Sequence, residues 1–281
     1  MKITLIGAGN LATCLGKALM DAGHEVVEVY SRTMASAEFL AKKLKTRATN
    51  DLHQVNTCSD VYILVVKDSA LESVIAAFSE HIRGYGSTAY DSCGEQPHSF
   101  GGGGGGFSPV ILHTAGSVPM DVFKGRCNHY GVLYPLQTFS KDKEIEFREI
   151  PIFIEGNDAE ALQVSRTLAE SVSQSVFDCT FEQRKYLHLA AVFACNFANH
   201  CYALSARLLE RQGIPFDVLL PLIDETARKV HTLPPKNAQT GPAIRYDKNI
   251  IQAQTELLCD FPDLLELYLK LSQSIHLMHN S

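Results

Sequence analysis

The residues Gly7 to Ala12 have the spacing G-x-G-x-x-A, which is typical of a turn that binds a pyrophosphate. An apolar strand, Lys2–Ile6, precedes the turn, and a helix, Leu11–Asp21, follows it. Glycines at such positions let the backbone N–H groups at a helix N-terminus approach an anion. The sequence therefore predicts a dinucleotide site at Gly7, Ala8, Gly9, Asn10 and Leu11. The alternative is a glycine-rich turn that has lost its cofactor.

The residues after the second expected strand indicate which dinucleotide binds. That strand is His24–Tyr30, and Ser31, Arg32 and Thr33 follow it. Proteins that bind NAD usually carry an acid here, which accepts a hydrogen bond from the ribose 2′-hydroxyl. Two hydroxyls and a guanidinium are instead donors that suit a 2′-phosphate. These three residues therefore predict NADP as the cofactor, and the alternative is that Arg32 is a solvated surface residue.

Two further strand ends carry polar residues where ligands of such sheets bind. Val61–Val66 is a continuous apolar run, as expected of a central parallel strand, and we expect Val66 and the following Lys67 to contact the cofactor. His113 ends the expected strand Val110–His113, near the predicted nicotinamide position. A histidine there could transfer a proton at neutral pH. The alternative is a histidine that orders the following turn.

A long uncharged helix carries further candidates. Phe181–Gln212 is typical of a single helix, with no Asp, Glu, Lys or Arg between Lys185 and Arg207. We expect His188, near its start, to act as an acid or base, and Asn196 to border the same cleft. The alternative is that the asparagines of this helix satisfy one another, or a partner helix, inside a buried interface.

A glycine–proline loop at residues 240–247 supplies a cation. Arg245 is suited to bind a substrate carboxylate or phosphate through two parallel hydrogen bonds, and the alternative is a local ion pair with Asp247. Tyr134 and Gln137 are further candidates for polar side chains in the pocket. Because clefts between domains are common ligand sites, we expect the substrate between the domains. The residues expected around it are His113, His188, Asn196 and Arg245.

The order of elements predicts the fold. Strands and helices alternate in the N-terminal half, as in a parallel sheet covered on both faces, and the chain after Thr180 is expected to be helical. We therefore predict an α/β fold, a Rossmann-type doubly wound parallel sheet followed by an all-helical C-terminal domain. The expected NADP-binding domain is 1–156, the last strand and helix elements with a connection are 157–179, and the helical substrate and dimerisation domain is 180–281. The other expected elements are helices at Ala35–Leu44, Ala70–His81, Asp217–His231, Asn249–Cys259 and Pro262–His279, and strands at His129–Leu133, Pro151–Glu155 and Ser175–Cys179.

Composition excludes several classes of protein. The 281 residues carry a net charge of −6 and no basic run, which argues against a general nucleic-acid binder. Polar residues within the long helix argue against a membrane span, and its apolar surface favours a homodimer built from the C-terminal helices. The eight cysteines are scattered and lack metal-ligand spacing, which indicates reduced thiols, as in a cytoplasmic protein, and no metal site. The first expected strand begins at residue 2, so no targeting peptide is expected, which also favours a cytoplasmic location. The run Gly101–Gly106 predicts a flexible surface excursion.

Seven segments, taken together, resemble the two-domain NADP oxidoreductases built from a Rossmann domain and the domain of unknown function 2520. They are IGAGNLA, VYSRT, ILVVKD, LHTAGS, YPLQTF, HLAAVFACNFANH and TGPAIRYD. The resemblance implies kinship with pyrroline-5-carboxylate reductases, deazaflavin-dependent NADP oxidoreductases and β-hydroxyacid dehydrogenases. The last group places a catalytic lysine on the equivalent helix, and His188 is the best replacement for it here. The family's usual Arg-Gly-Asp is also changed, to Arg245-Tyr246-Asp247.

Together these features predict an NADP(H)-dependent oxidoreductase that reduces a small carbonyl or imine by hydride transfer. The cofactor would supply the hydride, and the protein would supply position and a proton. The alternative is a nucleotide-binding sensor or scaffold without turnover, which the lack of an unmistakable catalytic lysine favours.

Overall fold

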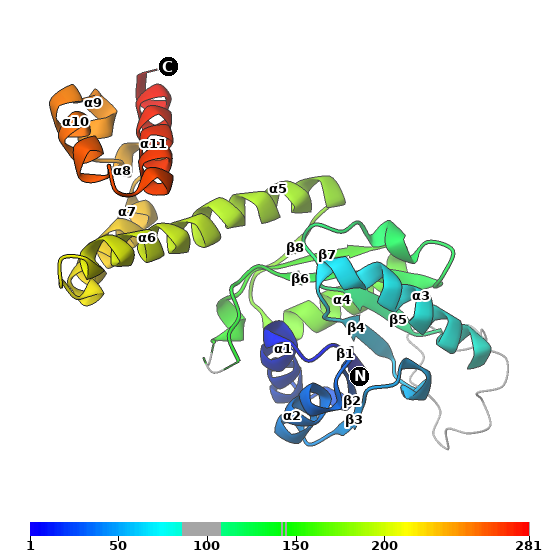
Figure 1. The fold of residues 1–281 in the computed structure, drawn as a ribbon. Helices are drawn as coiled ribbons and strands as arrows, with labels where there is room; N and C mark the ends of the chain where they lie inside the picture. Colours follow the sequence, from blue (N-terminus) through cyan, green and yellow to red (C-terminus); the bar gives the residue numbers. More distant parts are fainter. Residues whose placement is uncertain (86–107, 142, 144, 281) are drawn as a thin grey trace. The chain divides into compact units, whose positions relative to one another are not determined.

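The computed structural model describes residues 1–85, 108–141, 143 and 145–280, so the predicted excursion at Gly101–Gly106 lies outside the described residues. The described chain forms two units, Met1–Val192 and Phe193–Ser281. The first unit contains an eight-stranded sheet and the second is helical, which confirms the predicted fold class (Figure 1).

The sheet has the strand order β3-β2-β1-β4-β5-β6-β7-β8. Its strands are β1 (Lys2–Ile6), β2 (Glu25–Tyr30), β3 (Arg47–Thr49), β4 (Val61–Leu64), β5 (Val110–His113), β6 (His129–Pro135), β7 (Ile152–Gly156) and β8 (Val176–Asp178). Neighbouring strands are parallel except β6 and β7, which pair antiparallel. The sheet is thus mostly parallel rather than wholly parallel, and β7 and β8 run against the other six strands.

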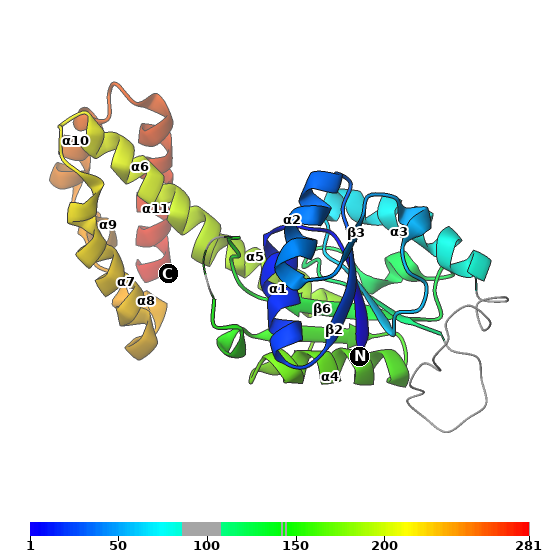
Figure 2. The same cartoon turned by 90° about the horizontal axis from the view of Figure 1, so that it is seen from below.

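Within the described residues, four helices cover the two faces of this sheet (Figures 1 and 2). They are α1 (Asn10–Asp21), α2 (Met34–Leu44), α3 (Asp68–Tyr85) and α4 (Ala159–Val172). Alternate residues of the buried strands belong to different core clusters, because successive side chains of a strand point to opposite faces. Ile63 packs in the cluster with α1, α2 and α4, whereas Tyr62 and Leu64 pack in the cluster with α3.

The long uncharged helix is not uniform. It comprises α5 (Phe181–Ala191), a π-helical turn at Val192–Phe197 and α6 (Ala198–Glu210). The chain is nevertheless helical without a break from Phe181 to Glu210, close to the predicted single helix, and the wider π turn in its middle changes the faces on which later side chains lie. The division between the two units falls within this turn.

The second unit continues with a 3-10 turn (Phe216–Leu219) and five helices. These are α7 (Leu220–Thr232), α8 (Pro235–Ala238), α9 (Pro242–Arg245), α10 (Lys248–Leu257) and α11 (Pro262–Asn280). Its core is small and centres on Leu258, Phe261 and Leu264. Many large apolar side chains of this unit are exposed in the single chain, and Leu257, Leu222 and Leu277 are the clearest examples.

Six of the described cysteines are free thiols, as expected of reduced cysteines. Cys58 is disulfide-bonded, so the expectation of reduced thiols throughout is wrong for that residue. Within the described part of the chain, no helix is long and apolar enough to span a membrane.

Candidate functional site

The turn between β1 and α1 is built so that only glycine fits its first position. Gly7 has φ +128°, and a Cβ atom there would collide with the carbonyl oxygen of Val65. The Gly7 N–H donates to the Tyr30 carbonyl over 2.8 Å. Strands β2 and β4 therefore approach this turn closely on both sides, which fixes where α1 begins.

The N-terminus of α1 is open to a ligand. Gly9 is its N-cap and provides no side-chain cap, and the first turn holds no acidic residue. A Cβ atom at Gly9 would meet no described atom within 4 Å, so the space above the backbone is free. Ala8 is buried beneath the turn, whereas the exposed Asn10 donates from Nδ2 to the carbonyl of Phe139 over 2.8 Å. The free N–H groups and the open space fit a pyrophosphate.

The end of β2 presents donors. Arg32 is exposed and forms no ion pair with the described residues. Thr33 begins α2 as its N-cap and donates from Oγ1 to Ser36 Oγ over 2.9 Å, and the Ser31 N–H donates to the Thr49 carbonyl. The acid within this strand, Glu28, is buried and accepts from the Asn56 N–H over 2.6 Å. With that carboxylate directed elsewhere, the strand end fits a 2′-phosphate better than a ribose 2′-hydroxyl.

The predicted cofactor contacts after β4 lie at the same edge of the sheet. Val65 donates from its N–H to the Ile6 carbonyl, which continues the pairing with β1 beyond the strand. Val66 is half-buried, and Lys67 is exposed just before α3 begins at Asp68. Both positions remain predicted contacts of the cofactor.

His113 is fully buried at the end of β5, which bears on its predicted role. Its Nδ1 accepts from the Ala115 N–H over 3.1 Å, and its ring stacks on Phe123 with the ring centroids 5.7 Å apart. Burial, and next the positive charge of Arg184, lower the pKa of His113 to about 3. A neutral imidazole bound to the turn that follows it supports the turn-ordering alternative over proton transfer.

His188 lies against the carboxyl end of β6. Its Nδ1 atom is 2.9 Å from the hydroxyl oxygen of Tyr134, the second-last residue of that strand. Gly116, three residues beyond β5, lies beneath both rings, because a Cβ atom there would stand 2.7 Å from His188 Nδ1 and 2.9 Å from Tyr134 Cζ. His188 thus lies at this strand end in contact with Tyr134, and its role as an acid or base stays a prediction.

An ion pair that the sequence analysis did not anticipate holds α5 in place. Arg184 is 1% exposed; its Nη1 contacts Glu155 of β7, and its Nη2 donates to the Val118 carbonyl over 2.7 Å. The Phe181 N–H also donates to Glu155 Oε1 over 3.1 Å. Because residues four apart share a face of a helix, the Arg184 contact places His188 one turn further along. The four-residue separation of Arg184 and His188 was the only feature of the sequence that pointed to this arrangement.

Asn196 and Arg245 belong to the second unit. Asn196 is exposed in the π-helical turn, and Arg245 is exposed at the end of α9. The Asp247 carboxylate caps α10 by accepting from the Ile250 N–H and forms no ion pair with Arg245. The local ion pair offered as an alternative for Arg245 is thus absent from the described contacts. The gathering of these two residues around His188 remains a prediction.

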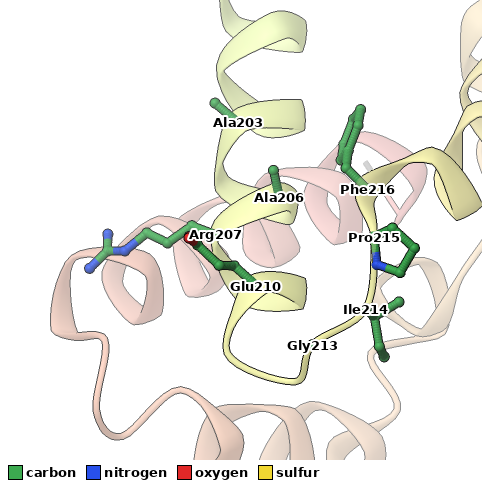
Figure 3. A pocket seen from close by; sticks show the side chains of 8 residues that line it. All are labelled: Ala203, Ala206, Arg207, Glu210, Gly213, Ile214, Pro215 and Phe216. Carbon is green, nitrogen blue, oxygen red and sulfur yellow. The ribbon is translucent and has the colours of Figure 1, made fainter.

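The second unit also has a groove of about 680 Å³ between α6 and the loop after it (Figure 3). Its lining residues are Ala203, Ala206, Arg207, Glu210, Gly213, Ile214, Pro215 and Phe216. Figure 3 shows the Arg207 guanidinium pointing away from Pro215 and Phe216, and it binds Asp263 over 2.7 Å. The groove is mostly apolar and contains none of the predicted site residues. No group of three His, Cys, Asp or Glu residues in the described ranges is arranged to hold a metal ion.

Comparison with known proteins identifies two family matches. The family described as NADP oxidoreductase, coenzyme F420-dependent, matches residues 2–84, and the domain of unknown function 2520 matches residues 150–275. None of the curated proteins compared with the chain matches it.

Solved structures match nearly the whole chain. A putative NADP oxidoreductase from Bacteroides fragilis is 49% identical, with a TM-score of 0.86 over 98% of this chain and 97% of that one. A protein from Thermotoga maritima is 20% identical (TM-score 0.75, 99% and 100% covered), and an imine reductase from Myxococcus stipitatus in complex with NADP+ is 16% identical (TM-score 0.60, 100% and 93% covered). At such identities the last two show a shared fold alone. The 49% identity over almost all of both chains shows that this chain belongs to the family of two-domain NADP oxidoreductases, whose cofactor is NADP.

Proposed function

We propose that the protein reduces a small carbonyl or imine compound with NADPH. The observation that carries this proposal is the open N-terminus of α1 beside the exposed, unpaired Arg32. When bound, NADPH supplies a hydride to the substrate carbon. Gly7 to Leu11 would hold the pyrophosphate, Ser31 to Thr33 the 2′-phosphate, and Val66 and Lys67 the part nearer the nicotinamide.

His188 is the proposed source of the proton. It is half-buried, bound to Tyr134 and located at the edge of the sheet where ligands of such folds bind. Asn196 and Arg245 are proposed to bind polar and anionic groups of the substrate from the second unit. His113 keeps a supporting role, because its buried ring orders the turn that leads to Gly116.

Dimerisation through the C-terminal helices belongs to the same proposal. Four large side chains repeat along one stripe of α5 and the π-helical turn, and each is at least half exposed: Tyr186, Leu189, Phe193 and Phe197. An apolar stripe of this size is typical of a surface that another chain covers. We also propose the boundaries 1–156, 157–179 and 180–281 for the functional domains, and a cytoplasmic location.

A sensor or scaffold without turnover is the second candidate. The lack of an unmistakable catalytic lysine favours it, since Lys185 lies near the start of α5 and forms an exposed ion pair with Glu182 over 2.6 Å.

One screen separates the two candidates. The purified protein is incubated with NADPH and a panel of small ketones, aldehydes and cyclic imines, and NADPH oxidation is followed at 340 nm, while calorimetry measures NADPH binding. Oxidation that depends on one compound supports the reductase. Tight NADPH binding without oxidation across the panel supports the sensor, and absence of binding overturns both.

A further inference from the structure

We propose that Tyr134 is a positioning residue that donates its hydroxyl proton to Nδ1 of His188, so that the imidazole presents Nε2–H to the substrate. The proposal rests on the proposed reductase function and adds the residue that determines the tautomer of the proton donor. It concerns only contacts within the first unit, where both residues lie.

The direction of the hydrogen bond follows from the partners that each group has. The Tyr134 side chain is buried, and His188 Nδ1 is the partner of its hydroxyl among the described residues. If the hydroxyl only accepted from Nδ1–H, its own proton would have no partner among the described residues at this part-buried contact, which is costly. Donation to Nδ1 avoids this cost. A neutral imidazole that accepts at Nδ1 carries its proton on Nε2.

The surrounding charges keep Tyr134 protonated and able to donate. Burial, and next the nearby carboxylate of Asp68, raise the pKa of Tyr134 to about 12, against the smaller opposing effect of Arg184. Asp68 is itself held, because its Oδ2 accepts from the Ser117 hydroxyl. The hydroxyl therefore stays neutral over the whole physiological range of pH.

The contact depends on two further features of the fold. Arg184 fixes α5 against β7 and the loop at Val118, which places the His188 ring over Gly116. Gly116 must lack a side chain, since a Cβ atom would stand 2.9 Å from His188 Cγ as well as from Tyr134 Cζ. Such separations lie well inside van der Waals contact, so a methyl group here would push the two rings apart.

The pair can supply one proton to the reaction. As the carbon of the C=O or C=N bond is reduced, the π electron pair of that bond moves to the heteroatom. The heteroatom takes the proton from His188 Nε2, and Nδ1 takes the proton from Tyr134 in the same direction. The imidazole remains neutral. When the product leaves, Nδ1 returns its proton to the Tyr134 oxygen and Nε2 takes a proton from water, which restores the starting tautomer. Because an alkoxide or an amide anion is more basic than a phenolate, this transfer runs downhill.

The tautomer of His188 can be measured without a substrate. Protein labelled with ¹⁵N-histidine is studied by long-range ¹H–¹⁵N NMR at pH 8, and His188 is assigned with His188→Gln. We expect the Nδ1 signal of an unprotonated nitrogen and an Nε2–H fraction near one. Tyr134→Phe should move the Nδ1 signal toward that of a solvent-exposed mixture of tautomers. Tyr130→Phe, a buried tyrosine on the same strand, is the matched control and should change nothing.

Three results would overturn the proposal: a protonated Nδ1 in the wild type, an unchanged His188 signal in Tyr134→Phe, or an equal change in Tyr130→Phe. If Tyr134→Phe does not fold, Gly116→Ala provides the second variant and should also give a mixture of His188 tautomers.

The activity measurement distinguishes failure of this proposal from failure of the proposed function. With a substrate from the panel, Tyr134→Phe should lower kcat at least tenfold and leave the Kd for NADPH unchanged. An unchanged kcat in a wild type that turns over would overturn the role of Tyr134. A fixed Nε2–H tautomer in a protein without turnover would overturn the reductase function and leave the pairing intact.

Discussion

The guanidinium of Arg184 and the carboxylate of Glu155 form an ion pair in which the arginine is almost fully buried. It joins the first turns of α5 to β7, and a hydrogen bond from the same guanidinium holds the Val118 carbonyl. One side chain thus connects a strand, a loop and the helix that carries His188. The site depends on this connection, because neither Tyr134 nor Gly116 is near His188 in sequence.

Removal of the arginine should destabilise the fold strongly. Arg184→Met leaves the Glu155 carboxylate partly buried without its partner, which typically costs about 3–5 kcal/mol in the free energy of unfolding. The matched control is Arg166→Met, which breaks the more exposed pair with Asp178 and should cost less than about 1 kcal/mol. Urea denaturation measures both variants. Equal losses in the free energy of unfolding would mean that burial does not make the Arg184–Glu155 pair more stabilising than the exposed pair.

NADPH should bind more tightly than NADH, and Arg32 should account for the difference. Loss of a charge-assisted contact to the 2′-phosphate costs about 1.5–3 kcal/mol, roughly a tenfold to hundredfold change in Kd. Arg32→Ala should therefore weaken NADPH binding and leave NADH binding almost unchanged. Arg148→Ala, at another exposed arginine of the first unit, is the control. Equal wild-type affinities for the two cofactors would contradict the assignment of Arg32.

Alanine substitutions at the two glycines of the turn should have different effects, one on stability and the other on NADPH binding. Gly7→Ala places a Cβ against the Val65 carbonyl at a positive φ, so it should lower the free energy of unfolding by about 1–3 kcal/mol or more. In Gly9→Ala the new Cβ atom enters open space at φ −80°, so the thermal stability of this variant should stay close to that of the wild type. The new methyl group would nevertheless stand where the pyrophosphate approaches, and NADPH should bind at least tenfold more weakly. Calorimetry and thermal unfolding of both variants check this contrast.

Some of these features can be read from the sequence and others cannot, for physical reasons. The turn at Gly7 was predictable because a local pattern determines it. The direction of β7 was not, since an apolar strand has the same appearance whether it pairs parallel or antiparallel. Helices α8 and α9 have four residues each, too few for a periodic pattern. The Tyr134–His188 contact joins residues 54 apart, and only the tertiary fold brings them together.

Acid should remove one stabilising contact of α4. Burial raises the pKa of Asp158, but hydrogen bonds from the Ala161 N–H and from His129 outweigh it, so the net pKa is lowered. A carboxyl with a lowered folded-state pKa stabilises the fold above its unfolded pKa of about 3.9 and loses this effect as the pH falls through the folded value. Asp158→Asn keeps a helix cap without the charge. The wild type should be the more stable at pH 7, and the difference in the free energy of unfolding should shrink as the pH falls below the unfolded pKa of about 3.9. A difference that stays constant over this range would contradict the charge-based explanation.

The last prediction concerns the exposed apolar stripe on the long helix. Phe193 is 64% exposed and its ring contacts Phe197 edge-on, with centroids 4.9 Å apart. If a second chain covers this stripe, light scattering at micromolar concentration should give twice the chain mass of 30.9 kDa. Phe193→Asp would bury a charge in that interface, which is costly, so it should yield monomers. Asp224→Asn, an exposed change on α7, is the control for a simple change of charge. Because the sheet of the first unit has its own core, the monomeric variant should keep NADPH binding, and a wild-type monomer would contradict the dimer outright.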